Sequence, residues 1–329
     1  MKDNELHLNV HGLDVRFRTT LSDFRAFIDE NYALFGSYRT GEVDVSVQFD
    51  PQSGADARDR AKSFRQVGDG IRYGDSAVYW ENNFGFNILV ERTTDALRVR
   101  AFHRELAEDQ SAEERYKNFQ RSMRWVVHFP VFTLLQYRRE WRLVHGAAVT
   151  DGDRTFAFCG LNKIGKSTLA TYLCREEGYS LITDNYLLVG SERVYAFPEV
   201  VRLDPASADR FGLEGIWSHL VYGKEHVSPT AIGTASEAVP DAFFLLSRGG
   251  EVSSAEIEPQ TAWQSMQNLH AMLGEFPQHG FMSVWPVATG ETRPVSSAET
   301  ILFDTPWYSL SYDPNWEFRA VTEEVHGCI

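Results

Sequence analysis

FCGLNKIGKSTLA (158–170) contains the pattern G-x-x-x-x-G-K-[ST] in full, from Gly160 to Ser167. In this Walker A pattern, the glycines let the backbone curl so that several N–H groups point at one oxyanion. The lysine adds a positive charge at the β- and γ-phosphates, and the hydroxyl completes the coordination of Mg²⁺. An apolar strand, TFAFC (155–159), precedes the pattern, and a helix over 169–177 follows it. A glycine-rich turn that matched by chance would lack this context, so the segment predicts a phosphate-binding loop (P-loop).

The residues expected to contact the nucleotide belong to the loop and the first helical turn. They are Gly160, Asn162, Lys163, Ile164, Gly165, Lys166, Ser167 and Thr168. The helix that begins here directs the positive end of its dipole at the phosphates. The expected cofactors are ATP, or another nucleoside triphosphate, and Mg²⁺.

A carboxylate follows the next apolar strand of the sequence. YSLIT (179–183) predicts a strand, and Asp184 comes directly after it. That position predicts a place at the C-terminal edge of the sheet, beside the loop, where open α/β sheets bind ligands. Asp184 would hold Mg²⁺ or activate the acceptor. The alternative is an aspartate that ends a strand in a turn, since Asp-Asn is a common turn pair.

Other polar residues nearby leave two interpretations open. His145, in the apolar strand LVHGAAV (143–149), fits a buried core residue and a ligand-contacting one equally well. Glu199, beside a proline, fits a metal or substrate contact and an exposed loop acid equally well. Arg202 could steer phosphate or pair with Glu199. For Lys224 and His226, an ordinary surface loop is favoured over closure on the phosphate.

From residue 142 onward, strand-like runs alternate with helical stretches, which indicates an α/β sheet covered by helices. The predicted strands are 143–149, 155–159, 179–183, 186–189, 194–197, 241–247 and 307–312, and a helix is predicted over 261–276. We therefore expect an α/β domain with a mixed sheet over residues 142–329.

Residues 1–110 predict a β-rich α+β domain of unknown role. The expected elements are a hairpin (5–10 and 13–18) around His11-Gly12, strands over 42–49, 77–80, 85–91 and 97–103, and a loop over 51–60. A helix capped by Thr20 would present Phe24, Phe27, Ile28 and Tyr32 as one apolar stripe. Residues 111–141 form a linking amphipathic helical region, which Pro130 should kink or restart.

Composition excludes several classes of protein. The 329 residues are 43% hydrophobic and 24% charged, which does not fit a disordered or collagen-like chain. The net charge of −14 argues against an electrostatic nucleic-acid binder. Three cysteines give no disulfide framework, and the longest apolar run, 126–135, is too short to span a bilayer. With no apolar signal core at the start, these features predict a cytoplasmic protein without a membrane partner.

LVHGAAV (143–149), FCGLNKIGKSTLA (158–170) and YSLITDNYLLV (179–189) together resemble HPr kinase/phosphorylase and its kinase-like relatives. That family is related to phosphoenolpyruvate carboxykinase. The resemblance implies that Asp184 is the general base on an acceptor serine hydroxyl, that His145 lies near the phosphates, and that Ser167 binds Mg²⁺. It is also compatible with a homo-oligomer.

The sequence departs from the family pattern at two places. The family's strand usually ends in two adjacent aspartates, whereas here the second is Asn185. Ser167, the Asn185 carbonyl and Glu199 are then the expected metal ligands, with Glu199 compensating for the missing charge. The glycine-rich signature tied to the reverse phosphorolysis reaction is absent, so forward kinase chemistry is expected.

Three functions remain to be compared. The first is an ATP-dependent kinase that phosphorylates a hydroxyl of a peptide, a protein or a small metabolite, using Asp184, His145 and Lys166. The second is a nucleotide-binding regulatory or adaptor protein without phosphoryl transfer. The third, a motor- or switch-type ATPase, ranks last because DAFFLL (241–246) begins with its acid, whereas a Walker B strand ends with one.

Overall fold

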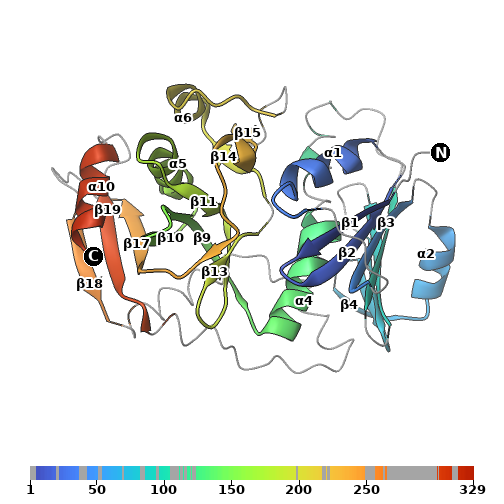
Figure 1. Cartoon of the computed structure of the whole chain (residues 1–329). Helices are drawn as coiled ribbons and strands as arrows, with labels where there is room; N and C mark the ends of the chain where they lie inside the picture. The colour runs from blue at the N-terminus through green and yellow to red at the C-terminus, as the bar shows by residue number, and fades with distance from the viewer. Residues whose placement is uncertain are drawn as a thin grey trace. The chain divides into compact units, whose positions relative to one another are not determined.

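A computed structural model provides the structure of the chain. It describes residues 5–19, 22–36, 43–50, 54–68, 70–81, 86–93, 96–103, 111, 114, 117–118, 120, 124–197, 199–216, 220, 223–248, 256–261, 264, 302, 304–312 and 318–329. The described residues up to Arg138 form one compact unit, and those from Arg139 onward form a second. Both units combine helices with β-sheets, and the larger sheet of each is mixed (Figure 1).

The first unit contains a sheet in which eight strands are described. Their order is β1 (Glu5–Val10), β2 (Leu13–Arg18), β3 (Val45–Asp50), β8 (Leu97–His103), β7 (Phe86–Arg92), β6 (Ala77–Glu81), β5 (Ile71–Gly74) and β4 (Arg65–Gly68). The pairs β2–β3 and β3–β8 are parallel, and the other pairs are antiparallel. The predicted hairpin is confirmed: His11 and Gly12 both have positive φ, as a two-residue hairpin turn requires.

Apolar side chains of this sheet face two helical segments. Val15, Phe17 and Val47 are buried on this face. Tyr32, which follows α1 (Ser22–Asn31), packs edge-on against Phe17 with ring centroids 5.4 Å apart. His128 of the π-helical turn η1 (Arg124–His128) lies against Phe27 at the same centroid distance of 5.4 Å. Phe27, Ile28 and Tyr32 of the predicted stripe are therefore directed at the core, whereas Thr20 and the side chain of Phe24 lie outside the description.

Two expectations for this unit are wrong. The segment expected to be a loop over 51–60 contains the helix α2 (Ala55–Ala61). The helix was not predicted because its segment is mostly polar. Its buried face consists of Ala57 and Ala61, which pack with Tyr79, Leu89 and Phe102. The strand expected from residue 42 begins at Val45. The strands β4 and β5 were not predicted from the sequence.

The linking helical region restarts near Pro130, as predicted. The described turn η1 ends at His128, and the helix α4 (Phe129–Arg139) begins at the next residue. Proline is tolerated there because the first turn of a helix has no intrahelical acceptor for its N–H group. Residues 116, 119 and 123, in the first half of this region, lie outside the described residues.

The second unit is built on a mixed sheet. Its described strands, in order, are β16 (Glu237–Ala238), β13 (Val194–Tyr195), β12 (Tyr186–Val189), β9 (Arg142–Thr150), β10 (Thr155–Cys159), β17 (Ala242–Arg248), β19 (Trp307–Tyr312) and β18 (Glu256–Gln260), with β11 (Ser180–Thr183) also paired to β9. β10, β17 and β19 are parallel neighbours. The predicted strands of this unit are present, with ends shifted by one or two residues.

The helices α5 (Lys166–Glu176) and α10 (Phe318–Gly327) pack on one face of this sheet (Figure 1). Leu169 and Leu173 of α5 and Val325 of α10 are fully buried against Phe156 and Phe244. Each such side chain contributes about 1.5–3 kcal/mol through burial. The same core includes Ala208 of α6 (Pro205–Arg210). The predicted helix over 261–276 lies largely outside the described residues.

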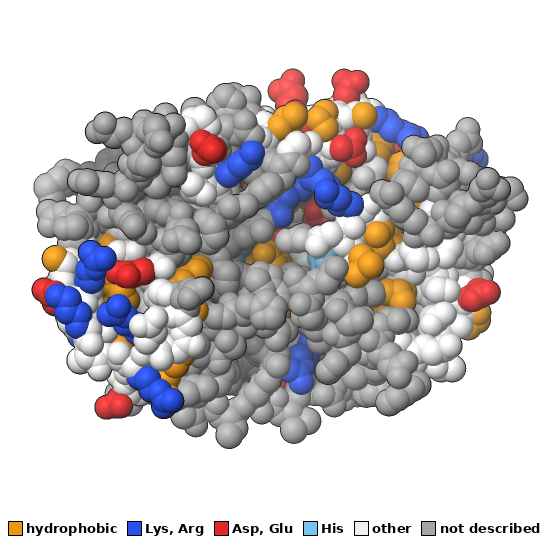
Figure 2. Space-filling model, turned by 180° about the vertical axis from the view of Figure 1, so that it is seen from behind, with side chains coloured by type: hydrophobic (Ala, Val, Ile, Leu, Met, Phe, Trp, Pro, Cys, Tyr) orange, Lys and Arg blue, Asp and Glu red, His pale blue; other side chains and the backbone are white. Residues whose placement is uncertain are grey.

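A small two-stranded sheet, β14 (Val201–Leu203) with β15 (Glu225–Val227), and the 3₁₀ turn η2 (Pro229–Ala231) complete the second unit's described elements. On the face shown in Figure 2, the coloured Lys and Arg side chains are interspersed with Asp and Glu side chains. In the described part of the chain, no helix is both long enough and apolar enough to cross a bilayer.

Candidate functional site

The segment between β10 and α5, which we call the glycine loop (160–165), wraps tightly around the start of α5. Gly160 and Gly165 have φ values of 144° and 104°, and Lys163 also has a positive φ of 64°. Gly165 is the N-cap residue, and the helix begins at Lys166, three residues earlier than predicted. The first N–H groups of α5 have no partner within the helix and are directed back toward the loop.

Neighbouring atoms explain why glycine occupies position 160. A Cβ atom there would collide with Ile164 Cδ1 and lie 2.8 Å from the carbonyl oxygen of Leu246. Across the loop, Tyr312 of β19 donates a hydrogen bond of 3.3 Å to the carbonyl oxygen of Ile164. The loop is therefore held in its curled shape from two other strands, β17 and β19.

Gly160→Ala is expected to lower the free energy of unfolding by about 1–3 kcal/mol, because the added methyl group overpacks the loop at a positive φ. Denaturant unfolding of the full chain measures this change. Gly327→Ala is the matched control, since nothing lies within 4 Å of a Cβ at that position. Equal stability of the two variants would contradict the packing described for the loop.

The Lys166 side chain is buried and bound to the loop itself. Its Nζ donates to the carbonyl oxygens of Gly160 and Leu161 at 2.8 and 2.7 Å. Of the other loop residues expected to contact a nucleotide, Asn162 and Lys163 are exposed. Ile164 is buried, and Thr168 is half-buried in the first turn of α5. The structure thus brings these residues together around one helix N-terminus.

Asp184 directly follows β11, as the sequence predicts, and lies where β11 continues into β12. Both strands run antiparallel to β9, with Thr183 opposite Ala148 and Tyr186 opposite His145. Asp184 and Asn185 therefore form a kink within the span of the sheet, and Asn185 has a positive φ of 73°. On the other side of β9, Gly146 is opposite Cys159, the last residue before the glycine loop. Gly146 N donates to the Asn185 carbonyl oxygen, so the kink is level with the end of β10 at which the glycine loop begins.

The Asp184 carboxylate faces the start of α5. Its Oδ1 accepts a hydrogen bond of 2.9 Å from Ser167 Oγ. Its Oδ2 is buried and has no hydrogen-bond partner among the described residues. Burial raises the pKa of Asp184 above its usual value, and the Ser167 hydrogen bond and the charges of Lys166 and Lys224 partly oppose this shift. An orphaned carboxylate oxygen in such a place fits an absent cation or proton donor.

Asn185 and Glu199 form a second contact beside Asp184. Asn185 Nδ2 donates to Glu199 Oε2 at 2.6 Å. Glu199 is buried and forms an ion pair with Arg202, so the pairing alternative for Arg202 is the one that the structure shows. Lys224 Nζ lies 3.5 Å from the carbonyl oxygen of Arg202. Glu199 is therefore a compensated buried acid and not an exposed loop residue.

His145 is buried beside the same groups. Burial lowers its pKa to about 3, the charge of Lys166 acts in the same direction, and a hydrogen bond with the Asn185 side chain opposes it. The imidazole is therefore neutral at physiological pH.

We expect His145 to show no titration between pH 5 and 8. Because its pKa is lower in the folded than in the unfolded chain, its contribution to stability rises with pH from about 3 to 6.5 and is lost as pH falls. NMR of the imidazole protons, assigned with His145→Gln, tests this. A His145 signal with a midpoint near pH 6.5 would contradict it.

The residues predicted to bind the metal ion or to act beside it form two hydrogen-bonded pairs. Ser167 contacts Asp184, and Asn185 contacts Glu199. The spacing of these residues along the chain did not predict the kink that brings the two pairs together. Among the described residues, no group of three or more His, Cys, Asp and Glu side chains is gathered as a metal site. Tyr312 was not predicted to contact the loop, because it lies 148 residues along the chain from the loop carbonyl that it binds.

Comparison with known proteins adds little to this geometry. No protein-family model matches the chain, and no curated protein matches it. Among solved structures, the Hpr(Ser) kinase/phosphatase from Coxiella burnetii is similar, with a TM-score of 0.29 and 9% sequence identity. The similarity covers 57% of this chain and 98% of that one. A TM-score of this size constrains neither fold nor function.

Proposed function

We propose that the second unit is an ATP-dependent kinase that transfers the γ-phosphate to a hydroxyl group. The observation that carries the proposal is the contact between Ser167 and Asp184. Asp184 is a buried carboxylate at the N-terminus of α5, next to the glycine loop, and its Oδ2 has no hydrogen-bond partner among the residues that the structure describes.

The glycine loop would bind the triphosphate. The curled backbone and the N-terminus of α5 supply N–H groups, and Lys166 supplies a charge. In the structure, Lys166 Nζ is held by two loop carbonyl oxygens, so it would exchange these for phosphate oxygens when nucleotide binds. Neutral His145 beside Lys166 adds no competing positive charge.

Mg²⁺ fits the oxygen atoms at the start of α5. Mg²⁺ keeps several of its waters and needs only one or two protein ligands besides phosphate oxygens, so a larger acidic cluster is not required. Ser167 Oγ and the Asp184 carboxylate would hold it, and Asn185 and Glu199 would join only by giving up their present partners. The ion would neutralise charge on the phosphates.

Asp184 would act as the general base. Its Oδ2 would take the proton of the acceptor hydroxyl while that oxygen bonds to the terminal phosphorus, and the bond from phosphorus to the leaving ADP oxygen breaks. A pKa raised by burial brings the carboxylate closer to the operating pH, which favours this role. The acceptor would be a peptide, a protein or a small metabolite.

A regulatory protein that binds nucleotide without transferring phosphate is the second candidate. The ion pair between Glu199 and Arg202 favours it, because it engages the acid that was expected to compensate for the missing second aspartate.

Incubation with γ-labelled ATP, Mg²⁺ and a fractionated extract of the source organism tests the two candidates. The kinase proposal is supported if the unmodified chain and Asp153→Asn transfer the label to a molecule of the extract and Asp184→Asn does not. Asp153 is the matched control because it is exposed and lies in the same unit. Bound ATP without label transfer from any fraction would favour the regulatory protein.

A further inference from the structure

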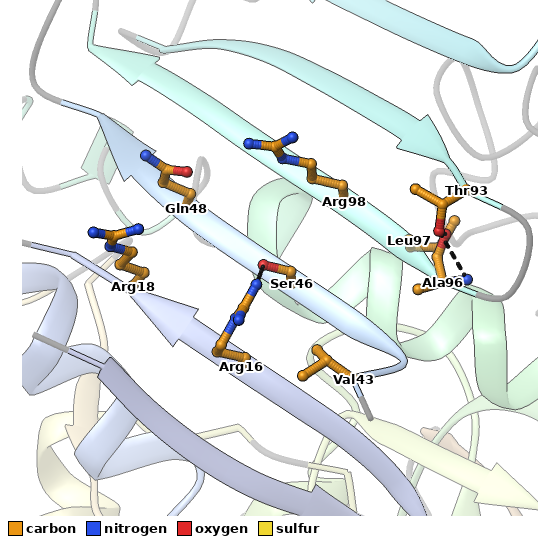
Figure 3. Close-up of a pocket in the computed structure, with 9 residues that line it drawn as sticks. All are labelled: Arg16, Arg18, Val43, Ser46, Gln48, Thr93, Ala96, Leu97 and Arg98. Atoms are coloured by element: carbon orange, nitrogen blue, oxygen red, sulfur yellow. Dashed lines mark hydrogen bonds between the residues drawn. The ribbon is translucent and has the colours of Figure 1, made fainter. Parts of the chain in front are cut away.

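The first unit contains a polar hollow that the proposed kinase site does not involve. It has a volume of about 360 Å³ and lies over strands β2, β3 and β8. Arg16 and Arg18 of β2, Ser46 and Gln48 of β3, and Arg98 of β8 contribute their side chains to it (Figure 3). The described residues that line it include three arginines and no acid.

Strand register brings these arginines to one place. Arg16 pairs with Ser46, and Ser46 pairs with Arg98, so the three residues form one row across the sheet. Arg18 and Gln48 are paired two residues further along, and side chains two residues apart share a face. Neighbouring strands are about 4.8 Å apart, which puts the backbones of Arg16 and Arg98 about 10 Å apart. Two arginine side chains can span that distance and reach one ligand above Ser46.

The helix α2 covers only the other end of this sheet face. Its Ala57 and Ala61 pack with Tyr79 and Leu89. Arg100, which pairs with Gln48, already points toward Asp56 of α2. Beyond it, Arg98 is exposed and Arg16 is half-buried. The hollow is therefore reachable from solvent, while its floor consists of hydrogen-bonded strands.

The carboxylates of Glu5 and Glu91, which lie near the hollow, form ion pairs with other cationic side chains. Glu5 pairs with Arg18 at 3.8 Å and with His7 at 3.7 Å. Glu91, which is opposite Arg98 on β7, forms ion pairs with Arg60 and Arg100. Neither of these two acids forms an ion pair with Arg16 or Arg98 in the part of the chain that the structure describes.

Arg16 carries a donor that lacks a partner. Its Nη2 donates to Ser46 Oγ at 3.2 Å, which fixes the guanidinium over β3. Its Nε is buried and has no hydrogen-bond partner among the described residues. A buried, oriented and unsatisfied N–H group of a cation is a feature that an anionic acceptor would remove.

We propose that this hollow binds a phosphate dianion, either inorganic phosphate or the phosphate group of a small monoester. Guanidinium groups bind phosphate oxygens through paired N–H donors, and Ser46 and Gln48 add neutral donors beside them. A carboxylate carries one charge and would be matched by one guanidinium, whereas the hollow offers those of Arg16 and Arg98, with Arg18, the partner of Glu5, beside them. Its volume is enough for a phosphate together with a small organic group.

Equilibrium dialysis of the full chain with labelled orthophosphate tests this proposal. Arg98→Gln is expected to weaken one class of phosphate sites at least about tenfold, since it removes a charged donor pair. Arg98→Lys keeps the positive charge but loses the paired N–H donors of the guanidinium group, so it should weaken phosphate binding less than Arg98→Gln does. Arg65→Gln is the matched control, because Arg65 is exposed on β4 of the same sheet. The glycine loop is the same in all four proteins, so binding there cancels in the comparison.

Equal phosphate affinity in the unmodified chain and Arg98→Gln would overturn the proposal. Loss of phosphate binding in Arg65→Gln to the same extent would also overturn it, as it would show nonspecific charge attraction. Displacement of phosphate by acetate as readily as by sulfate would rule out selection of a dianion. Displacement by phosphoserine would identify a monoester as the ligand, and displacement by orthophosphate alone would identify the inorganic ion.

Discussion

Asp184→Asn is expected to lower the rate of phosphoryl transfer about 10²–10⁴-fold, the usual contribution of a general base. ATP affinity should change little, because the glycine loop and Lys166 remain in place. The amide keeps an oxygen that can accept the Ser167 hydrogen bond, so the geometry at the start of α5 is preserved. Rates measured at saturating acceptor, together with ATP affinity from calorimetry, separate the two effects.

The same substitution should stabilise the fold. Burial raises the folded-state pKa of Asp184 above its usual value of 3.8. A group with a raised pKa contributes stability below its unfolded pKa and loses that contribution as pH rises through its folded pKa. At pH 7 the free energy of unfolding of Asp184→Asn should therefore exceed that of the unmodified chain by about 0.5–2 kcal/mol. Loss of transfer with loss of stability would indicate a damaged fold and contradict the assignment.

Lys166→Ala is expected to weaken ATP binding about 10–100-fold, since a charged hydrogen-bond donor contributes about 1.5–3 kcal/mol. The substitution also removes the only described side-chain donor bound to the Gly160 and Leu161 carbonyl oxygens. Calorimetric titration with ATP and Mg²⁺ measures the loss.

Arg175→Ala is the control for Lys166→Ala, because Arg175 is an exposed cation in the last turn of the same helix. Lys166→Met, which keeps most of the buried stem, distinguishes loss of charge from loss of packing. If both Lys166 variants bound ATP as tightly as Arg175→Ala does, the glycine loop would not be the nucleotide site.

The strand–loop–helix around Gly160 could be predicted because every part of it is local in sequence. The apolar strand β10, the two glycines and the apolar face of α5 lie within 22 consecutive residues, 155–176. The hairpin at His11-Gly12 was predictable for the same reason. In each case a short turn with positive φ joins two segments whose periodicity is clear.

The sequence predicted that Asp184 lies beside the loop, but its burial and its neighbour Asn185's contact with Glu199 could not be predicted, because they depend on strand register. Nothing local shows that β11 and β12 both pair with β9, and this pairing turns Asp184 and Asn185 toward different partners. Tyr312 reaches the loop only through the parallel pairing of β19 with β17. The metal roles of Ser167, Asn185 and Glu199 remain predictions.

In the first unit, the polar hollow and the helix α2 could not be predicted from the sequence either. Arg16 and Arg98 are 82 residues apart in the sequence, and only the parallel pairing of β2, β3 and β8 aligns them. α2 was hidden because its buried face consists of two alanines in an otherwise polar segment. The hydrophobic periodicity of the sequence predicts neither the alignment of the arginines nor the helix α2.

The most direct test of the kinase assignment compares the unmodified chain with Asp184→Asn at equal occupancy by γ-labelled ATP and Mg²⁺. The measured quantity is the rate at which label enters a hydroxyl-bearing acceptor. We predict a ratio of at least about 100 in favour of the unmodified chain. A ratio near one would contradict the role of Asp184 and with it the proposed site of transfer.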